Sequence, residues 1–190
     1  MVVALYEATQ PEQLHDMLSV GARQNMGGIV MLGLGIEGFT FLHVAISLVA
    51  LAAGFVAVGG WLSGTQLPRA THLFLWTTVL TNVTGLLFPF NGLLPSHIVA
   101  LISLALLAIA LYAFYARGGL GLWRNVFVAT SLAALYLNAF VLIVQTFLKN
   151  PALAALAPTQ SEPPFVAAQA LTLLTFLVLG YCALRRAGRI

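Results

Sequence analysis

The stretch LTNVTGLLFPFNGLLPSH, from Leu80 to His97, joins two long apolar runs of the chain. It sets one asparagine and two threonines within an apolar run, breaks at FPFNG, and restarts with a proline, a serine and a histidine. Pro89 can end a helix, and Asn91-Gly92 favours a tight reversal of the chain. The stretch therefore predicts two antiparallel helices joined by a short turn, with polar side chains close to that turn.

Composition places these helices in a membrane. Of the 190 residues, 61% are hydrophobic and only 7% are charged, and the mean hydropathy is +0.99. A soluble domain carries about 25% charged residues, which solvate its surface. Because so few charges cannot wet a globule of this size, most of the outer surface must face lipid. The one cysteine, Cys182, excludes an internal disulfide and a metal site built from cysteines.

Five apolar runs follow one another along the chain. Each has about 20 residues or more, the length that an α-helix needs to cross about 30 Å of hydrocarbon. A transmembrane β-barrel would instead show alternating segments of about ten residues. The sequence therefore predicts an all-α fold, an integral membrane bundle of about five transmembrane helices. The predicted spans are Thr40–Leu62, Thr71–Phe90, Leu94–Ala116, Leu122–Phe147 and Pro164–Leu184.

Two regions follow from this division. Residues 40–190 form the predicted five-span bundle, and residues 1–39 form an N-terminal segment outside the cytoplasm. Within that segment, PEQLHDMLSVGARQ (residues 11–24) is able to form a short amphipathic helix on the outer membrane surface.

The basic residues predict the orientation. If the N-terminus is outside, Arg23 and Lys149 lie outside with all five acidic residues, and the remaining basic residues face the cytoplasm. This is the distribution that the positive-inside rule describes. We therefore predict a membrane protein with its N-terminus outside and its C-terminus in the cytoplasm. The cytoplasmic residues are Arg69, Arg117, Arg124, Arg185, Arg186 and Arg189.

The strongly polar side chains of the predicted spans share a depth. At about 1.5 Å per residue, His43 and His97 both lie roughly 5 Å below the outer surface, and Asn82 lies roughly 12 Å below it. Polar groups in hydrocarbon seek partners, because an unpaired group costs several kcal/mol. We therefore expect a polar pocket that opens outward, with Ser161–Pro163 folded over it. Its predicted lining is His43, Asn82, His97, Asn138, Gln145, Glu162 and Gln169.

Helical spacing supports this grouping. Ser131, Asn138 and Gln145 recur every seven residues, which keeps them on one helical stripe. His43 is followed at helical spacing by Ser47, Ala50 and Gly54, small residues that allow close helix approach. The simpler interpretation is that interhelical amides and hydroxyls only hold helices together, at about 0.6 kcal/mol each.

The leading functional hypothesis is a non-enzymatic module. It would bind a small ligand, a lipid, a quinone or a haem in the outer pocket, or act as an accessory subunit of a membrane complex. Two imidazoles at one level, His43 and His97, could hold a haem or a metal. The alternatives are a membrane enzyme, with His97 as base and Glu162 as acid or orienting partner, and a small transporter.

The partners expected are the lipid bilayer and either other membrane subunits or a second copy of the chain, and no nucleic acid. The absence of a carboxylate in the middle of a span argues against a proton or cation relay. His72, near Arg69, is expected to lie at the inner membrane boundary.

Two stretches resemble a set of small bacterial inner-membrane proteins, mostly proteobacterial, which are known only as hypothetical proteins. The stretches are Leu80–Val99, with its TNVTG, FPF and GLLPSH motifs, and Tyr136–Phe165, with LAPTQSEPPF. The resemblance covers about Thr40 to Leu184. It implies a bacterial inner-membrane location and assigns no activity to any residue.

Overall fold

The computed structural model describes residues 35–88, 95–119 and 121–187, and every regular element in these ranges is a helix. The all-α prediction is therefore confirmed for this part of the chain. The chain divides into two compact units, Met1–His43 and Val44–Ile190, and the boundary falls within the first described helix. The predicted amphipathic helix at residues 11–24 lies outside the described residues.

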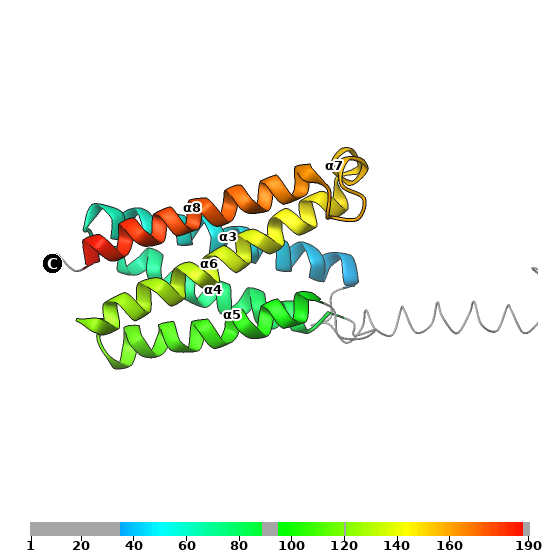
Figure 1. Cartoon of the computed structure of the whole chain (residues 1–190). Coiled ribbons are helices and arrows are strands. Elements are labelled where there is room, and N and C mark those ends of the chain that lie inside the picture. The colour runs from blue at the N-terminus through cyan, green and yellow to red at the C-terminus, as the bar shows by residue number, and fades with distance from the viewer. Residues whose placement is uncertain (1–34, 89–94, 120, 188–190) are drawn as a thin grey trace, which may run out of the picture. The chain divides into compact units, whose positions relative to one another are not determined.

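Five long helices and two short elements make up the described chain (Figure 1). The long helices match the five predicted spans, and most of them are a few residues longer. Pro68 and Pro163, for example, begin helices α4 and α8, because a proline in the first turn needs no partner for a backbone N–H. The elements are α3 (Ile36–Ser63), α4 (Pro68–Leu86), α5 (Pro95–Leu111), the π-helix η1 (Tyr112–Ala116), α6 (Leu122–Lys149), α7 (Pro151–Leu156) and α8 (Pro163–Ala187).

Four of the described helical segments are long and apolar enough to cross a membrane, with mean hydropathies between 1.9 and 2.5. Four such helices in one short chain indicate a membrane protein. The helix that falls outside this group is α4, which matches the predicted second span. The four segments are Ile36–Ser63, His97–Ala116, Leu122–Lys149 and Pro163–Arg186.

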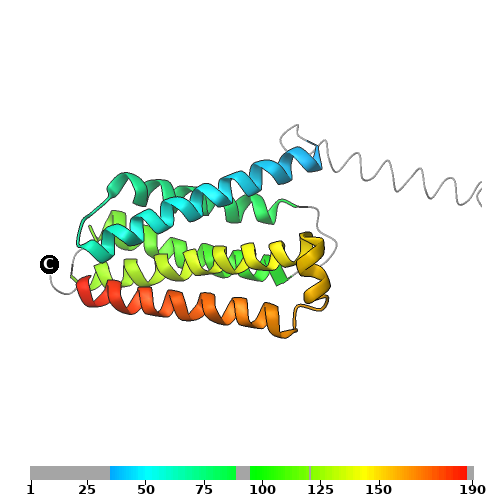
Figure 2. The ribbon, with the colours of Figure 1, turned by 90° about the horizontal axis from the view of Figure 1, so that it is seen from above.

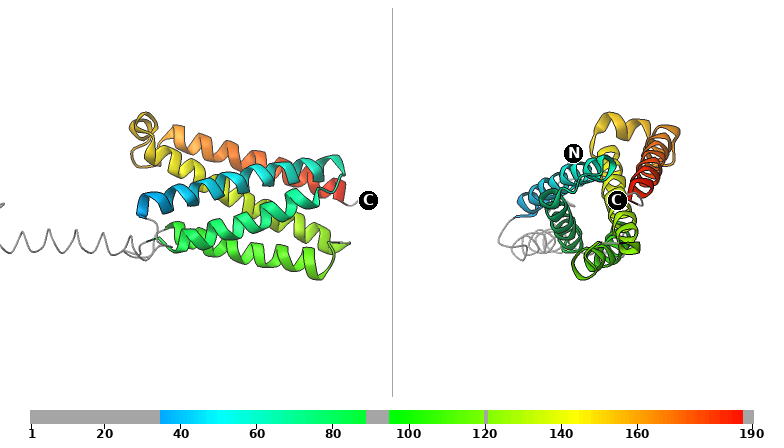
Figure 3. Two further views of the ribbon diagram at one scale, coloured as in Figure 1. Left: turned by 180° about the vertical axis from the view of Figure 1, so that it is seen from behind. Right: turned by 90° about the vertical axis from the view of Figure 1, so that its left-hand side faces the viewer.

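Within the second unit, α6 is the helix that the others pack against. It contacts α4, α5, α7 and α8, most extensively α5 and α8. The end of α3 joins it through Trp61, whose ring meets that of Phe127 edge to face at 5.4 Å. Viewed end on, α8 lies beside α6 and away from α4 and α5 (Figure 3). Consistent with this outlying position, only 11% of the α8 span is buried, against 33% of the α6 span.

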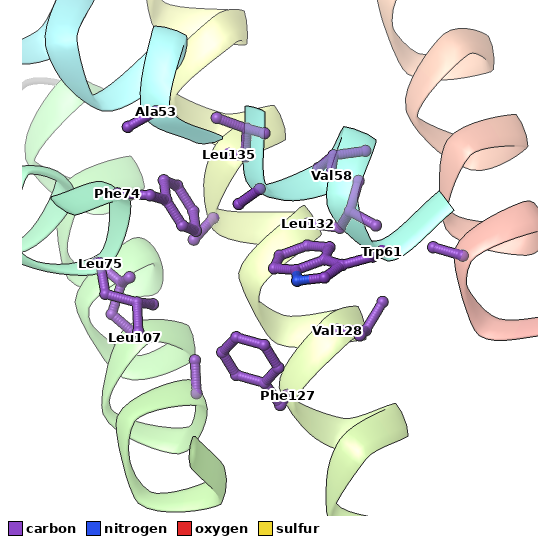
Figure 4. Packing of buried hydrophobic residues seen from close by; sticks show 14 of the residues in the cluster. Ala53, Val58, Trp61, Phe74, Leu75, Leu107, Phe127, Val128, Leu132 and Leu135 are labelled. Carbon is purple, nitrogen blue, oxygen red and sulfur yellow. The ribbon is translucent and has the colours of Figure 1, made fainter. Parts of the chain in front are cut away.

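A single apolar cluster fills the interior between these helices (Figure 4). Phe74 of α4, Leu107 of α5 and Leu135 of α6 are no more than 1% exposed. Gly54 of α3 allows the close approach expected from its sequence: a Cβ placed there would lie 2.5 Å from Leu135 Cδ1 and 2.9 Å from Phe74 Cδ2. Close packing of this kind supplies the attraction between helices in a membrane, where lipid is as apolar as the side chains.

The polarity of α4 is reversed relative to a helix of a water-soluble protein. Of its six buried residues, Thr71, Phe74, Leu75, Thr78, Thr81 and Thr84, four are threonines. Its exposed face carries large apolar side chains instead, among them Leu73, Trp76, Leu80 and Val83. An apolar outer face and a polar inner face suit a helix that is surrounded by lipid on one side and by protein on the other.

Three of the four buried threonines of α4 donate hydrogen bonds to their own helix. The Thr78 hydroxyl donates to the Phe74 carbonyl oxygen at 2.6 Å, and the Thr81 hydroxyl donates to that of Thr77 at 2.9 Å. The Thr84 hydroxyl donates in the same way to the Leu80 carbonyl oxygen at 2.8 Å. Each of these bonds satisfies a buried hydroxyl donor within the helix itself.

The short helix α7, which the sequence did not predict, connects α6 to α8 (Figure 2). Asn150 caps it, since its Oδ1 accepts from the Ala152 amide at 3.0 Å, and Pro151 follows in the first turn. A second apolar cluster, formed by Phe147, Ala157 and Phe165, packs the connection against the end of α6.

Gly60 provides a test of the close packing at the end of α3. A Cβ placed there would lie 2.8 Å from the Thr65 carbonyl oxygen, a backbone atom that cannot move aside cheaply. We expect Gly60→Ala to lower the free energy of unfolding by about 1–3 kcal/mol. Thermal unfolding of the detergent-solubilised protein would measure this.

The matched control is Gly59→Ala, since Gly59 is exposed and a Cβ there meets nothing within 4 Å. Equal unfolding temperatures for the two variants would contradict the packing described for the α3–α4 connection.

Candidate functional site

The described part of the second unit has two chemically different ends. At one end, the arginine end, α3 and α8 finish while α4 and α6 begin, and the Arg186 guanidinium donates to the Leu62 carbonyl oxygen. At the other, the α7 end, α4 and α6 finish while α5 and α8 begin, and the charged residues are Lys149 and Glu162. The arginine end carries Arg69, Arg117, Arg124, Arg185 and Arg186.

Two of the predicted site residues lie on α4 and α5, in the half of the unit nearer the α7 end. Asn82 is half-buried, and its Nδ2 donates to the Thr78 carbonyl oxygen at 2.7 Å. His97 lies in the first turn of α5 and is only 5% exposed. The side-chain amide of Asn82 thus extends the self-satisfied polar face of α4, while His97 brings a titratable ring into the interior.

The polar residues of α6 differ from those of α4 in their hydrogen bonds. Ser131 is fully buried, and its Oγ has no hydrogen-bond partner among the described residues. The same holds for Nδ2 of Asn138, one heptad further along the helix. The neighbouring Thr130, by contrast, donates to the Val126 carbonyl oxygen at 2.8 Å. A buried donor without a partner costs about 1–3 kcal/mol, so these two positions are where an additional hydrogen-bonding group would be accommodated.

The predicted lining residues Gln145 and Gln169 occupy α6 and α8. Gln169 is half-buried, and its Nε2 donates to the Phe140 carbonyl oxygen of α6 at 3.3 Å. Its Oε1 is buried without a partner in the described chain. Gln145 is half-buried near the end of α6. Gln169 therefore ties α8 to α6 and leaves one acceptor unused.

Glu162 organises the connection before α8. Its Oε1 accepts from the Thr159 amide at 3.1 Å and from the Thr159 hydroxyl at 2.8 Å, and its Oε2 accepts from the Ser161 amide at 3.1 Å. Desolvation raises the pKa of Glu162, but these hydrogen bonds outweigh it and hold the pKa below the ordinary value of 4.5. The hydrogen bonds of the Glu162 carboxylate are thus made within its own connection, and they do not require His97 as a partner.

His43 is the last residue of the first unit and is half-buried. The prediction that His43 and His97 lie at one level and hold a haem or a metal stays a prediction. Among the described residues, no group of three or more histidine, cysteine, aspartate or glutamate side chains is arranged to hold a metal ion.

An aromatic cluster at the arginine end was not predicted. The Tyr115 hydroxyl hydrogen-bonds to Nδ1 of His72 at 2.5 Å and accepts from Nε1 of Trp76 at 3.2 Å. Tyr115 belongs to the π-helix η1, whose widened turn has no recognisable pattern in a single sequence. The sequence placed His72 at a membrane boundary, but the pairing with Tyr115 depends on how α4 meets η1.

The structure therefore groups Asn82, His97, Asn138, Gln145 and Gln169 in one half of the second unit, with Glu162 in the adjoining connection. Comparison of the chain with protein-family models, with curated proteins and with solved structures found no match in any of the three. The chemistry of this half of the molecule is thus argued from its own residues.

The role given to Glu162 predicts a pH dependence. Because its folded pKa is lowered, the ionised carboxylate stabilises the 159–162 turn above the ordinary pKa of 4.5, and this stabilisation is lost as the pH falls below that value. We expect Glu162→Gln to speed hydrogen exchange of the Thr159 and Ser161 amides at neutral pH. At low pH the protection factors of these two amides, which correct for the intrinsic exchange rate, should be similar in the variant and the original protein.

Ser161→Ala is the control, since it keeps the backbone amide that donates to Glu162. Unchanged amide protection in Glu162→Gln at neutral pH would contradict the capping role.

Proposed function

We propose that the chain is a five-span protein of the bacterial inner membrane, in which α4 crosses the membrane in addition to the four more apolar helices. The reversed polarity of α4 supports this, because its exposed leucine, valine and tryptophan side chains suit lipid while its buried threonines bond to their own backbone. A helix of 19 residues is about long enough to cross the hydrocarbon layer.

We further propose that the arginine end faces the cytoplasm, so that the protein is N-out and C-in. In the described part of the second unit, five arginines lie at that end, while Lys149 is the one basic residue at the other. This asymmetry is the pattern of the positive-inside rule. Arg117 and Arg185 lie over the rings of Trp123 and Tyr181, at 4.7 and 4.8 Å, which is suitable for anchoring at a membrane boundary.

For the function, we propose that the interior of the bundle around the middle of α6 binds a small ligand without catalysing a reaction. The observation that carries this proposal is the pair of buried, unpartnered polar atoms on α6, Ser131 Oγ and Asn138 Nδ2. Lipid offers them no hydrogen bonds, and they are retained on a helix whose two threonine hydroxyls, of Thr130 and Thr146, are bonded to their own backbone.

The chemistry of these atoms defines the ligand class. The amide nitrogen of Asn138 can only donate, and the hydroxyl of Ser131 can donate as well. The two residues lie seven positions apart on one helical stripe, or roughly 10 Å along the axis. A largely apolar molecule that carries carbonyl or ester oxygens, as a quinone or a lipid does, would meet both.

Substitution at Ser131 and Asn138 tests the proposal. If a ligand occupies the two donors, Ser131→Ala and Asn138→Leu should lower the unfolding temperature of protein purified from its native membrane, because the ligand is lost. Native mass spectrometry should detect a bound species in the original protein and a much reduced amount in both variants. If no ligand binds, removing an unsatisfied buried donor should leave the stability unchanged or raise it.

Thr130→Val is the matched control, because the Thr130 hydroxyl is already bonded to its own helix. The proposal is wrong if no bound species is found and both Ser131→Ala and Asn138→Leu unfold at a higher temperature than the original protein.

A further inference from the structure

A cavity of about 60 Å³ lies at the arginine end of the second unit. Its apolar wall includes Trp61, Phe127 and Val128, which Figure 4 shows side by side at the end of the hydrophobic core. One water needs roughly 10–15 Å³ of such volume. The cavity therefore has room for several waters or for one compact polar group, and it is too small for a whole metabolite.

Polar side chains from separate elements meet in this cavity. Gln66 lies in the connection between α3 and α4, Thr71 is on the first turn of α4 and is only 2% exposed, and Arg124 is in the first turn of α6. The guanidinium of Arg124 is half-buried and makes no hydrogen bond or ion pair with any described residue. A cavity that is mainly apolar and holds a few convergent polar groups is the usual form of a binding site.

Arg124 differs in this respect from three of the four other arginines at the same end. The guanidinium of Arg117 lies over the Trp123 ring, that of Arg185 lies over the Tyr181 ring, and Arg186 donates to the Leu62 carbonyl oxygen. Glu162, the one acidic residue in the described part of this unit, belongs to the opposite end. The described part of this unit thus supplies no carboxylate at the end where Arg124 lies, which leaves its charge available to an anionic ligand.

The walls of the cavity are fixed by contacts that make its shape specific. Phe114 of η1 lines it and stacks against Phe127 at 5.0 Å, while the next residue, Tyr115, is bonded to His72 and Trp76. Gly118 and Gly119 also line the cavity, in left-handed conformations with φ of 64° and 59°. Such a preformed site needs little reorganisation to bind an ion.

From these observations we propose that the cavity is a binding site for the phosphoryl group of an anionic ligand. Arg124 supplies the charge and a planar set of donors that matches phosphate oxygens, and Thr71 and Gln66 supply further hydrogen bonds. The small volume admits the phosphoryl group and leaves the rest of the ligand outside. An anionic phospholipid and a free phosphate ion present the same group, and both have access to a cavity at the boundary of the bundle.

Binding to the purified full chain in detergent tests the proposal independently of the site on α6. One arm titrates inorganic phosphate, and the other titrates phosphatidylglycerol in mixed micelles against phosphatidylcholine at equal mole fraction. The readout is tryptophan fluorescence, since Trp61 lines the cavity, together with the unfolding temperature. We expect saturable binding in at least one arm, and at least about a tenfold loss of affinity in Arg124→Gln.

Arg185→Gln is the matched control, because it removes one positive charge from the same end and is absent from the cavity lining. Its affinity should stay within about twofold of the original protein. Binding in the phosphate arm alone assigns the site to a soluble phosphate, and binding in the lipid arm alone assigns it to a phospholipid; both support the proposal. Failure of both probes to saturate, or an equal loss in the two arginine variants, would overturn it.

Thr71→Val gives a second test if Arg124→Gln is not recovered folded. It removes one hydroxyl with little change of volume, so the fold should persist and the affinity should fall several-fold. Unchanged affinity in Thr71→Val would also overturn the proposal, because the hydroxyl would then not contact the ligand.

Discussion

Hydrocarbon offers no hydrogen bonds, and this constraint explains the arrangement of polar groups in the protein. On α4 the constraint is met locally: threonines face the interior and bond to the carbonyl oxygens one turn back, while leucine, valine and tryptophan face outward. This helix is on average the least apolar of the five long ones, yet it exposes the large apolar side chains of Leu73, Trp76, Leu80 and Val83. The average polarity of a span is therefore less informative than the side on which its polar groups lie.

The other polar groups are distributed in ways that point to different uses. On α6, Ser131 Oγ and Asn138 Nδ2 are buried without partners among the described residues, and the proposed ligand site rests on these two atoms. At the α7 end, Glu162 accepts hydrogen bonds from the 159–162 turn, and Asn150 caps the start of α7. At the arginine end, three of the five guanidinium groups lie over aromatic rings or donate to a carbonyl oxygen. Arg124 is the one charged residue that lines the cavity. The polar groups thus divide into those whose hydrogen bonds are made within the described chain and those on which the two proposed sites are based.

Much of the fold was predictable from sequence because its cause is composition. Long apolar runs separated by short glycine- and proline-containing connections gave the helices and their antiparallel order within a few residues. The helices that carry Asn82, His97, Asn138 and Gln169, and their positions along them, were also predictable, because the apolar runs fix where each helix begins. The hydrogen bonds of the polar side chains could not be predicted. Nothing in the spacing distinguishes Thr78, whose hydroxyl is bonded, from Ser131, whose hydroxyl is not.

Features that depend on contacts between distant segments could not be predicted. The π-helix η1 arises where the end of α5 meets α4, and the cavity beside it needs Trp61, Thr71, Phe114 and Arg124, which belong to four different elements. The short helix α7 was missed because its PALAAL sequence reads as an ordinary connection until Asn150 and Pro151 are recognised as its start.

The central claim is that α4 crosses the membrane with its threonine face inward. Single cysteines at Gln66 and Asn91, which flank α4, would be introduced one at a time into a Cys182→Ser background and labelled in intact cells with a membrane-impermeant thiol reagent. The account predicts that Asn91→Cys is labelled in intact cells and that Gln66→Cys is labelled only after the membrane is opened. Labelling of both positions from the same side would contradict it, because α4 would then enter and leave through one face of the bilayer.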